Sequence, residues 1–157
     1  MTSKNKLDII KKIYVGLLLV IFGGIVLHAP ISVGLGTIWP DYYLLAKSWK
    51  EILMLIAGIV AILLLYQTKQ FRILRDPIII AIGAYAVLHL ILISYNATGL
   101  ASSSAGLAID LRYLLFFALV YIAVRLYPKY RKIFIQVGIA GALIVLLFAI
   151  LLSLIHI

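Results

Sequence analysis

Long apolar segments alternate with short polar or basic segments along the whole chain. Each apolar segment approaches the roughly 20 residues that an α-helix needs to cross the hydrocarbon core of a bilayer. The segments are apolar on all sides, as is typical of helices embedded in lipid. The pattern predicts an all-α fold, a polytopic membrane helix bundle with about five transmembrane helices in a single domain over residues 1–151. The predicted spans cover residues 13–27, 49–66, 77–95, 107–126 and 133–151.

Prolines and a Ser/Gly-rich stretch predict where these helices begin and end. Proline disfavours helix at the residue before it, so we expect the first helix to end at His28-Ala29-Pro30. Residues 31–48 then form the longest loop. Pro77 suits the first position of a helix, which predicts the start of the third span. Residues 96–106, rich in Ser and Gly, predict a loop before the fourth span.

The charge distribution predicts the orientation of the chain. Hydrophobic residues make up 66% of the sequence, and the mean hydropathy is +1.21. Eleven of the 14 lysines and arginines fall in residues 1–12, 67–76 and 125–132. We therefore expect a multi-pass protein of the plasma (inner) membrane. The charge bias predicts that its N-terminus and both internal basic segments face the cytoplasm. It also explains the net charge of +9 without nucleic acid, so we expect membrane lipids as partners and no nucleic acid.

Few residue patterns in the sequence point to catalysis. The chain has no cysteine, which excludes disulfides and thiolate chemistry. Its His, Asp and Glu residues do not show the spacing of a metal site, and its glycines do not form a phosphate-binding loop. We therefore expect no cofactor, no metal and no catalytic residue within this sequence.

Two charges near the start of the fourth span are the strongest site candidates. Asp110 and Arg112 are two residues apart, so on a helix they point to different faces and do not pair with each other. Arg112 is within snorkelling reach of the outer interface, with Glu51 the nearest partner by depth. Lys47 and Lys50 are the expected partners of Asp110. These charges form either ion pairs that lock the second and fourth helices together or a cationic site for a lipid-linked phosphate, which arginine binds bidentately.

Three short segments carry a resemblance to a known family. They are His-Ala-Pro at 28–30, Lys-Ser-Trp-Lys-Glu-Ile-Leu at 47–53, and Asp-Leu-Arg-Tyr-Leu-Leu-Phe-Phe at 110–117. Together they resemble the amino-terminal part of bacterial O-antigen ligase and polymerase-like membrane proteins. The resemblance implies a metal-independent glycosyltransferase of cell-envelope polysaccharide biosynthesis. Such an enzyme passes a glycan from an undecaprenyl-diphosphate carrier to a lipid or sugar acceptor, with Arg112 as a diphosphate contact.

The last six residues of the sequence predict that only part of the natural protein is present. Leu-Ser-Leu-Ile-His-Ile at 152–157 resembles a translated transposon end from DNA library preparation. We therefore expect an artefactual tail there and a natural chain that continues, so that the family's catalytic residues lie beyond this sequence and the fragment alone is inactive.

Two alternatives to the glycosyltransferase stay open. A small non-catalytic membrane assembly or accessory protein would explain the scarcity of acid/base groups. A transporter predicts inverted repeats and broken helices, and the sequence shows neither.

Overall fold

The computed structural model describes residues 3–38, 43–95 and 100–155, and the side chains of these ranges except at 3–4, 29–31, 33, 35–36, 43–47, 100–105, 107–110, 152 and 155. Within these ranges the chain forms five α-helices and two short 3₁₀-helices, which confirms the all-α prediction. In chain order they are α1 (Ser3–Ile38), α2 (Tyr43–Thr68), η2 (Phe71–Arg75), α3 (Pro77–Tyr95), α4 (Leu100–Leu126), η3 (Pro128–Tyr130) and α5 (Arg131–Ile155).

Four stretches of these helices are long and apolar enough to cross a membrane. They are Asn5–His28, Ser48–Thr68, Pro77–Tyr95 and Pro128–Leu151. Several crossings of this kind indicate a multi-pass membrane protein.

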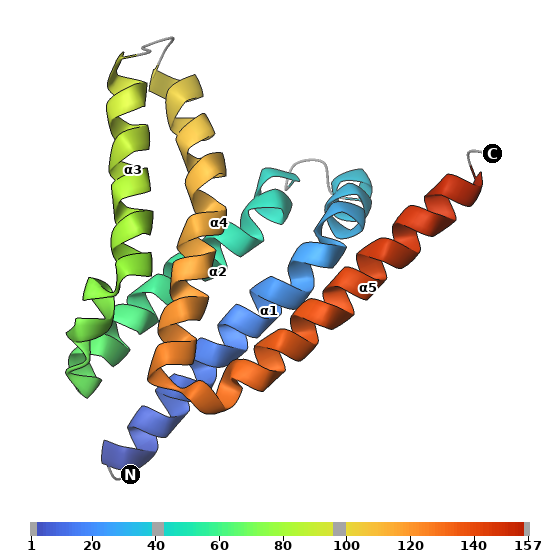
Figure 1. Ribbon diagram of the computed structural model, residues 1–157. Helices are drawn as coiled ribbons and strands as arrows, with labels where there is room; N and C mark the ends of the chain where they lie inside the picture. Colours follow the sequence, from blue (N-terminus) through green and yellow to red (C-terminus); the bar gives the residue numbers. More distant parts are fainter. Residues whose placement is uncertain (1–2, 39–42, 96–99, 156–157) are drawn as a thin grey trace.

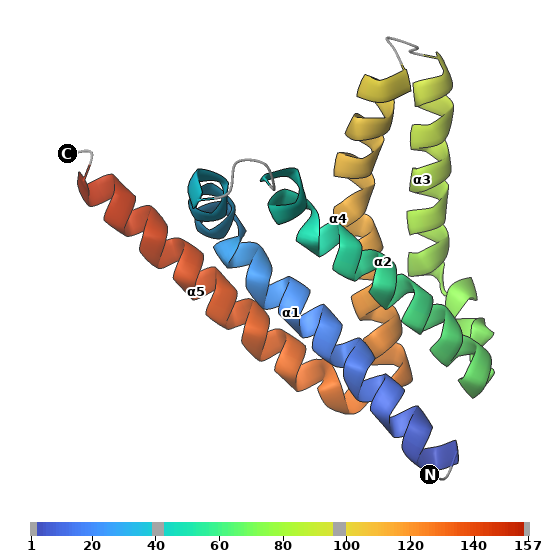
Figure 2. The ribbon, with the colours of Figure 1, turned by 180° about the vertical axis from the view of Figure 1, so that it is seen from behind.

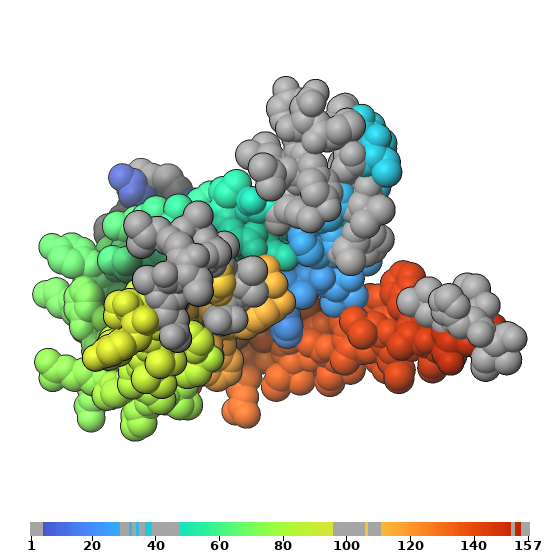
Figure 3. Space-filling view, turned by 90° about the horizontal axis from the view of Figure 1, so that it is seen from above, coloured from blue at the N-terminus to red at the C-terminus, as the bar shows by residue number. Residues whose placement is uncertain are grey.

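The helices form two groups that separate toward one end of the molecule. α1 and α2 pack antiparallel, and α5 lies along the other side of α1, as both ribbon views show (Figures 1 and 2). α3 and α4 form a second antiparallel hairpin that leans away from α5 (Figure 1). Seen from above, α3 and α5 lie on opposite sides of the molecule (Figure 3). α4 therefore connects the two groups through its contacts with α1 and α2.

The buried core lies in the half of the bundle nearer the N-terminus. Within it, the Tyr14 hydroxyl donates a hydrogen bond of 2.7 Å to the backbone carbonyl of Leu119, which links α1 to α4. α2 contributes two alanines, Ala57 and Ala61, whose small side chains permit close helix approach. Ile73 anchors η2 to the same core. The cluster consists of Tyr14, Val15, Leu18, Ala57, Ala61, Leu64, Leu65, Ile73, Leu119, Ile122, Ala123, Leu126 and Phe134.

Two glycines allow α5 to pack closely on α1. A Cβ at Gly138 would lie 3.2 Å from Cζ of Phe22, and one at Gly141 would lie 3.0 Å from Cγ2 of Val26. Small residues at such contacts let membrane helices gain dispersion energy through close approach. The contact between α1 and α5 joins the two described helices that lie farthest apart in the sequence.

The predicted end of the first helix at Pro30 is wrong. α1 continues to Ile38 and α2 begins at Tyr43, so most of the expected loop at 31–48 is helical. The last part of α1 turns away from the axis of its first part (Figures 1 and 2). Proline removes one backbone hydrogen bond and bends a helix, and membrane helices tolerate this because continuing the helix keeps the other backbone groups satisfied.

The predicted loop at 96–106 is also largely wrong. α4 begins at Leu100, and residues 96–99 lie outside the described part of the chain. Serine and glycine cost a helix only about 0.5–1 kcal/mol each relative to alanine. The apolar neighbours Leu100, Ala101, Ala105 and Leu107 favour helix strongly enough to include the Ser/Gly stretch.

A tight backbone motif ends α2. Lys69 has a left-handed φ of 55°. Its N–H donates to the carbonyl of Tyr66 over 3.3 Å, and the N–H of Gln70 donates to the carbonyl of Leu65 over 3.2 Å. This is the Schellman pattern, which normally has glycine at the left-handed position. Pro77 then begins α3, as the sequence predicted.

A polar cluster ties α3 to α4 at this end of the bundle. The Tyr121 hydroxyl donates to Oδ2 of Asp76 over 2.9 Å. Nε and an Nη of Arg125 donate to the same oxygen over 2.9 and 2.8 Å. The hydrogen bond from Tyr121, followed by the bond and charge of Arg125, lowers the pKa of Asp76 below its ordinary value of 3.8. The carboxylate therefore fixes the start of α3 against the last turn of α4.

Candidate functional site

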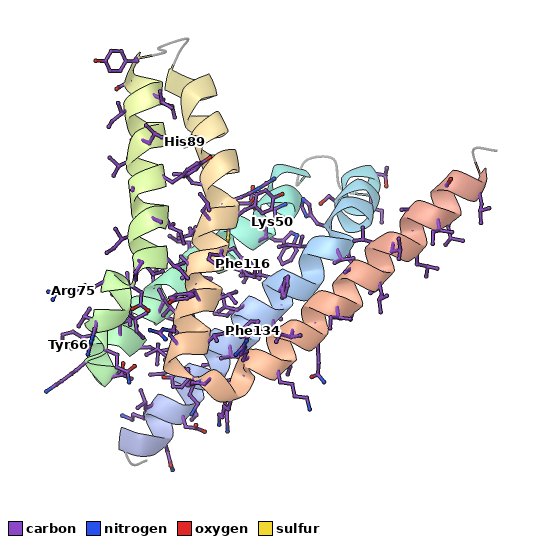
Figure 4. The ribbon with its side chains drawn as sticks, viewed as in Figure 1. Lys50, Tyr66, Arg75, His89, Phe116 and Phe134 are labelled. Atoms are coloured by element: carbon purple, nitrogen blue, oxygen red, sulfur yellow. The ribbon has the colours of Figure 1, made fainter. Side chains whose placement is uncertain are left out.

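A pocket opens between α1, α2 and α4 in the half of the bundle away from the N-terminus. Its volume is about 500 Å³. Figure 4 labels two of its residues, Lys50 from the start of α2 and Phe116 from α4. Isoleucines of α1 line the apolar part, and charged groups of α2 and α4 line the polar part. The lining residues are Ile21, Ile25, His28, Ser48, Lys50, Glu51, Met54, Arg112, Tyr113 and Phe116.

Arg112 and Glu51 meet across this pocket. Nη1 of Arg112 lies 3.4 Å from Oε1 of Glu51, and the two side chains are 25% and 39% exposed. Nη2 of Arg112 donates to the Tyr113 hydroxyl over 3.0 Å, and the guanidinium lies 4.7 Å from the centre of the Tyr113 ring. The carboxylate contact is long and involves one oxygen, whereas a strong Arg–carboxylate pair is short and bidentate.

Both partners keep unused hydrogen-bonding capacity. Nε of Arg112 and Oε2 of Glu51 are buried, and neither has a hydrogen-bond partner among the described atoms. A buried polar atom without a partner costs about 1–3 kcal/mol. The pair is therefore an incomplete lock between α2 and α4, and Arg112 retains a donor for an incoming oxygen.

The other predicted site residues divide into two groups. Lys50 lines the pocket with Arg112 and Glu51, so the described charged lining carries a net charge of +1. The side chains of Lys47 and Asp110 lie outside the described residues, and their predicted contacts stay predictions. The structure thus brings Lys50, Glu51 and Arg112 together from two helices.

A histidine on the pocket wall is held by neighbours from two helices. Nε1 of Trp49 donates to Nδ1 of His28 over 3.2 Å, and Oγ of Ser32 lies 3.2 Å from the same nitrogen. The indole N–H is only a donor, so Nδ1 of His28 accepts and the neutral ring carries its proton on Nε2. Ser32 is only 4% exposed. The pocket therefore contains an imidazole with a fixed tautomer.

Gly24 makes room for this arrangement. A Cβ at Gly24 would lie 2.5 Å from Cη2 of Trp49, so the indole lies directly on the glycine. Gly24 and His28 are four residues apart and share one face of α1, which aligns the ring with the imidazole. The sequence predicted His28 at a helix end and did not predict its contact with Trp49. The spacing of Gly24 and His28 was the available signal, but it does not reveal the partner helix.

The lining of this pocket combines charged, imidazole and apolar groups. Among the residues that the structure describes, no three His, Cys, Asp or Glu side chains gather to hold a metal ion. Two cations, one carboxylate and one imidazole above an apolar wall fit an anionic group attached to a hydrocarbon chain. Comparisons of this chain with protein-family models, curated proteins and solved structures give no match.

Proposed function

We propose that this chain binds the diphosphate of a polyprenyl-diphosphate-linked glycan in the pocket between α1, α2 and α4. The setting is cell-envelope polysaccharide assembly, where the resemblance to the amino-terminal part of O-antigen ligase-like glycosyltransferases would place it. The role proposed for the described residues is carrier binding. The observation that carries the proposal is Arg112. Among the described residues its guanidinium has one long carboxylate contact, and its buried Nε has no hydrogen-bond partner.

The size and polarity of the pocket support this ligand class. A volume of about 500 Å³ lies within the 300–1,000 Å³ typical of small-molecule sites. The guanidinium has five N–H donors in a planar fork that matches phosphate oxygens. Ile21 and Ile25 provide an apolar wall beside these donors, as a lipid-linked anion requires.

The distribution of basic segments supports the orientation in which this pocket faces the outer surface. The start of α1, η2 and η3 lie at one end of the bundle (Figure 1). The pocket is lined by residues nearer the other end, among them Lys50 (Figure 4). The basic segments 1–12, 67–76 and 125–132 belong to that first end. Cytoplasmic segments carry the excess of lysine and arginine. We therefore propose a cytoplasmic N-terminus and all five helices as spans, α4 included.

Titration of the purified chain with undecaprenyl diphosphate tests the proposal, with undecaprenol as the control lacking phosphate. Thermal unfolding in detergent reports binding through mass action. Arg112→Gln is expected to weaken the diphosphate affinity about tenfold or more, because a charge-assisted hydrogen bond contributes about 1.5–3 kcal/mol. Glu51→Gln is expected to strengthen it, since the competing carboxylate disappears and the lining charge rises by one.

The opposite changes at Glu51 and Arg112 separate this proposal from a purely structural ion pair. If the pair only locks α2 to α4, both variants lower the melting temperature and neither alters the response to diphosphate. Equal responses of the unmodified chain to undecaprenyl diphosphate and undecaprenol would also refute the proposal.

A second candidate function is a non-catalytic assembly subunit. α3 has no buried residue in the described chain, and α5 exposes large apolar side chains along most of its length. Such faces suit contacts with the helices of a partner membrane protein. Oligomer analysis in native-like lipid discs distinguishes the two candidates, because an assembly subunit forms a stable complex without preferring the diphosphate.

A further inference from the structure

A second pocket lies at the opposite, basic end of the bundle. It has a volume of about 500 Å³ and is formed by the α2–α3 connection and the end of α4. Its lining residues are Lys69, Gln70, Arg72, Ile73, Asp76 and Arg125. Three cations and one carboxylate give this lining a net charge of +2.

The backbone around this pocket is held in place by contacts already described. The left-handed Lys69 ends α2 and directs the chain into η2. Ile73 is 8% exposed and anchors η2 in the core, so its neighbours Arg72 and Leu74 stay at the surface. Asp76 is fixed by Tyr121 and Arg125. The cationic groups are therefore presented by an ordered segment and not by a free loop.

Two of the three cations keep their charge available. Arg125 shares the carboxylate of Asp76 through Nε and an Nη. Lys69 and Arg72 form no ion pair within 4 Å in the described part of the chain, and both side chains are exposed. The excess positive charge thus concentrates at the α2 end of the pocket.

The part of the chain that carries these cations, residues 66–78, also exposes apolar side chains. Tyr66 is 72% exposed, Phe71 46%, Leu74 41% and Ile78 44%. Figure 4 shows Tyr66 and Arg75 together at the outer edge of the molecule beside η2. A soluble anion needs only the cations, whereas a phospholipid needs cations for its phosphate and an apolar surface beside them for its acyl chains. Cation pockets at the cytoplasmic ends of membrane helices suit anionic lipid headgroups.

We propose that the pocket lined by Lys69, Arg72, Asp76 and Arg125 binds the phosphate headgroup of an anionic phospholipid of the cytoplasmic leaflet. Lys69 and Arg72 provide the charge that attracts the phosphate. Arg125 fixes the position of Asp76 at the edge of the pocket through its hydrogen bond and ion pair. Only the choice of leaflet rests on the orientation proposed above. The binding itself is independent of the diphosphate pocket at the other end.

Thermal unfolding of the whole chain in a neutral detergent tests the inference, with dioleoyl phosphatidylglycerol as the probe. Phosphatidylcholine controls for the acyl chains and inorganic phosphate for the anion. The variant K69N/R72Q removes both unpaired cations, and asparagine tolerates the left-handed backbone at position 69. The control K6Q/K132Q removes the same charge from exposed positions at the same end of the bundle, outside the pocket.

Phosphatidylglycerol is expected to raise the melting temperature of the unmodified chain and of K6Q/K132Q. K69N/R72Q is expected to bind it about 30-fold more weakly, which corresponds to about 2 kcal/mol for two basic side chains. An equal response of K69N/R72Q and K6Q/K132Q would overturn the proposal. An equal response to inorganic phosphate at the same concentration would overturn the lipid assignment in favour of a soluble anion.

A second measurement needs no variant. A photoactivatable phosphatidylglycerol is crosslinked to the unmodified chain, and the modified peptides are mapped. Crosslinks in residues 66–76 and 121–125 are the expected result. Crosslinks confined to other segments would overturn the assignment. Failure of the diphosphate experiment at Arg112 leaves both results unchanged, so the two proposals fail separately.

Discussion

Replacing Gly24 by alanine is expected to destabilise the packing of α1 against α2. The new methyl group would lie 2.5 Å from Cη2 of Trp49, well inside van der Waals contact, so the indole must move. Overpacking of this kind costs about 1–3 kcal/mol. The displaced indole also loses its 3.2 Å hydrogen bond to His28, a further cost of about 0.5–1.5 kcal/mol.

The adjacent glycine provides a matched control. A Cβ at Gly23 meets nothing within 4 Å, so Gly23→Ala carries the helix-propensity gain of about 0.5–1 kcal/mol without any overlap. Gly24→Ala receives the same gain, which cancels when the two variants are compared. We expect Gly24→Ala to be about 2–4 kcal/mol less stable than Gly23→Ala.

Unfolding of both variants in mixed micelles by titration with sodium dodecyl sulfate measures this difference. A Trp39→Phe background leaves Trp49 as the single tryptophan. Its emission is expected to shift in Gly24→Ala and to stay unchanged in Gly23→Ala. Equal stabilities together with equal emission spectra would refute the packing of Trp49 on Gly24 and, with it, the fixed tautomer of His28.

Three further predictions concern the ends and bends of the helices. Lys69→Gly is expected to stabilise the chain by about 0.5–1 kcal/mol in the same unfolding titration. Glycine removes the cost of about 1–2 kcal/mol that a residue with a Cβ has in the left-handed conformation, and it adds a smaller entropy cost. A loss of stability would contradict this. Because the pKa of Asp76 is lowered, its contribution to folding stability is complete above pH 3.8 and is lost as the pH falls through the lower folded-state pKa. Asp76→Asn is therefore expected to reduce the fall in melting temperature at acidic pH. An unchanged fall would contradict this. Pro30→Ala is expected to straighten α1, so that the distance between spin labels at Val20 and Ile38 lengthens toward about 27 Å, and an unaltered distance would show that proline is not the cause of the bend.

The sequence predicted the parts of the fold that depend on local composition. The apolar segments became helices, and Pro77 begins α3 because its missing N–H costs nothing in a first turn. The same reasoning failed at Pro30, where a local preference competes with the demand for backbone hydrogen bonds in lipid. It failed again at the Ser/Gly stretch before Leu107, since weak propensities add up to less than the gain from extending a helix.

The candidate site shows the same limit at the level of side chains. Glu51 and Arg112 were matched by depth in the membrane, which sequence position gives directly, and the structure places them 3.4 Å apart. The contact between His28 and Trp49 depends on the rotation of α1 against α2, which periodicity cannot give when helices are apolar on all sides. The Asp76–Tyr121–Arg125 cluster was missed because the basic segments appeared only as determinants of topology.

The packing of α5 against α1 also constrains the order in which the bundle assembles during synthesis. Phe22 and Val26 of α1 pack against Gly138 and Gly141 of α5. Ribosomes add about 5–20 residues per second, so α1 waits on the order of 5–20 seconds before its partner helix emerges. Throughout that interval this face of α1 is covered by lipid or by the insertion machinery. The contact between α1 and α5 therefore forms only after α2, α3 and α4 have been synthesised.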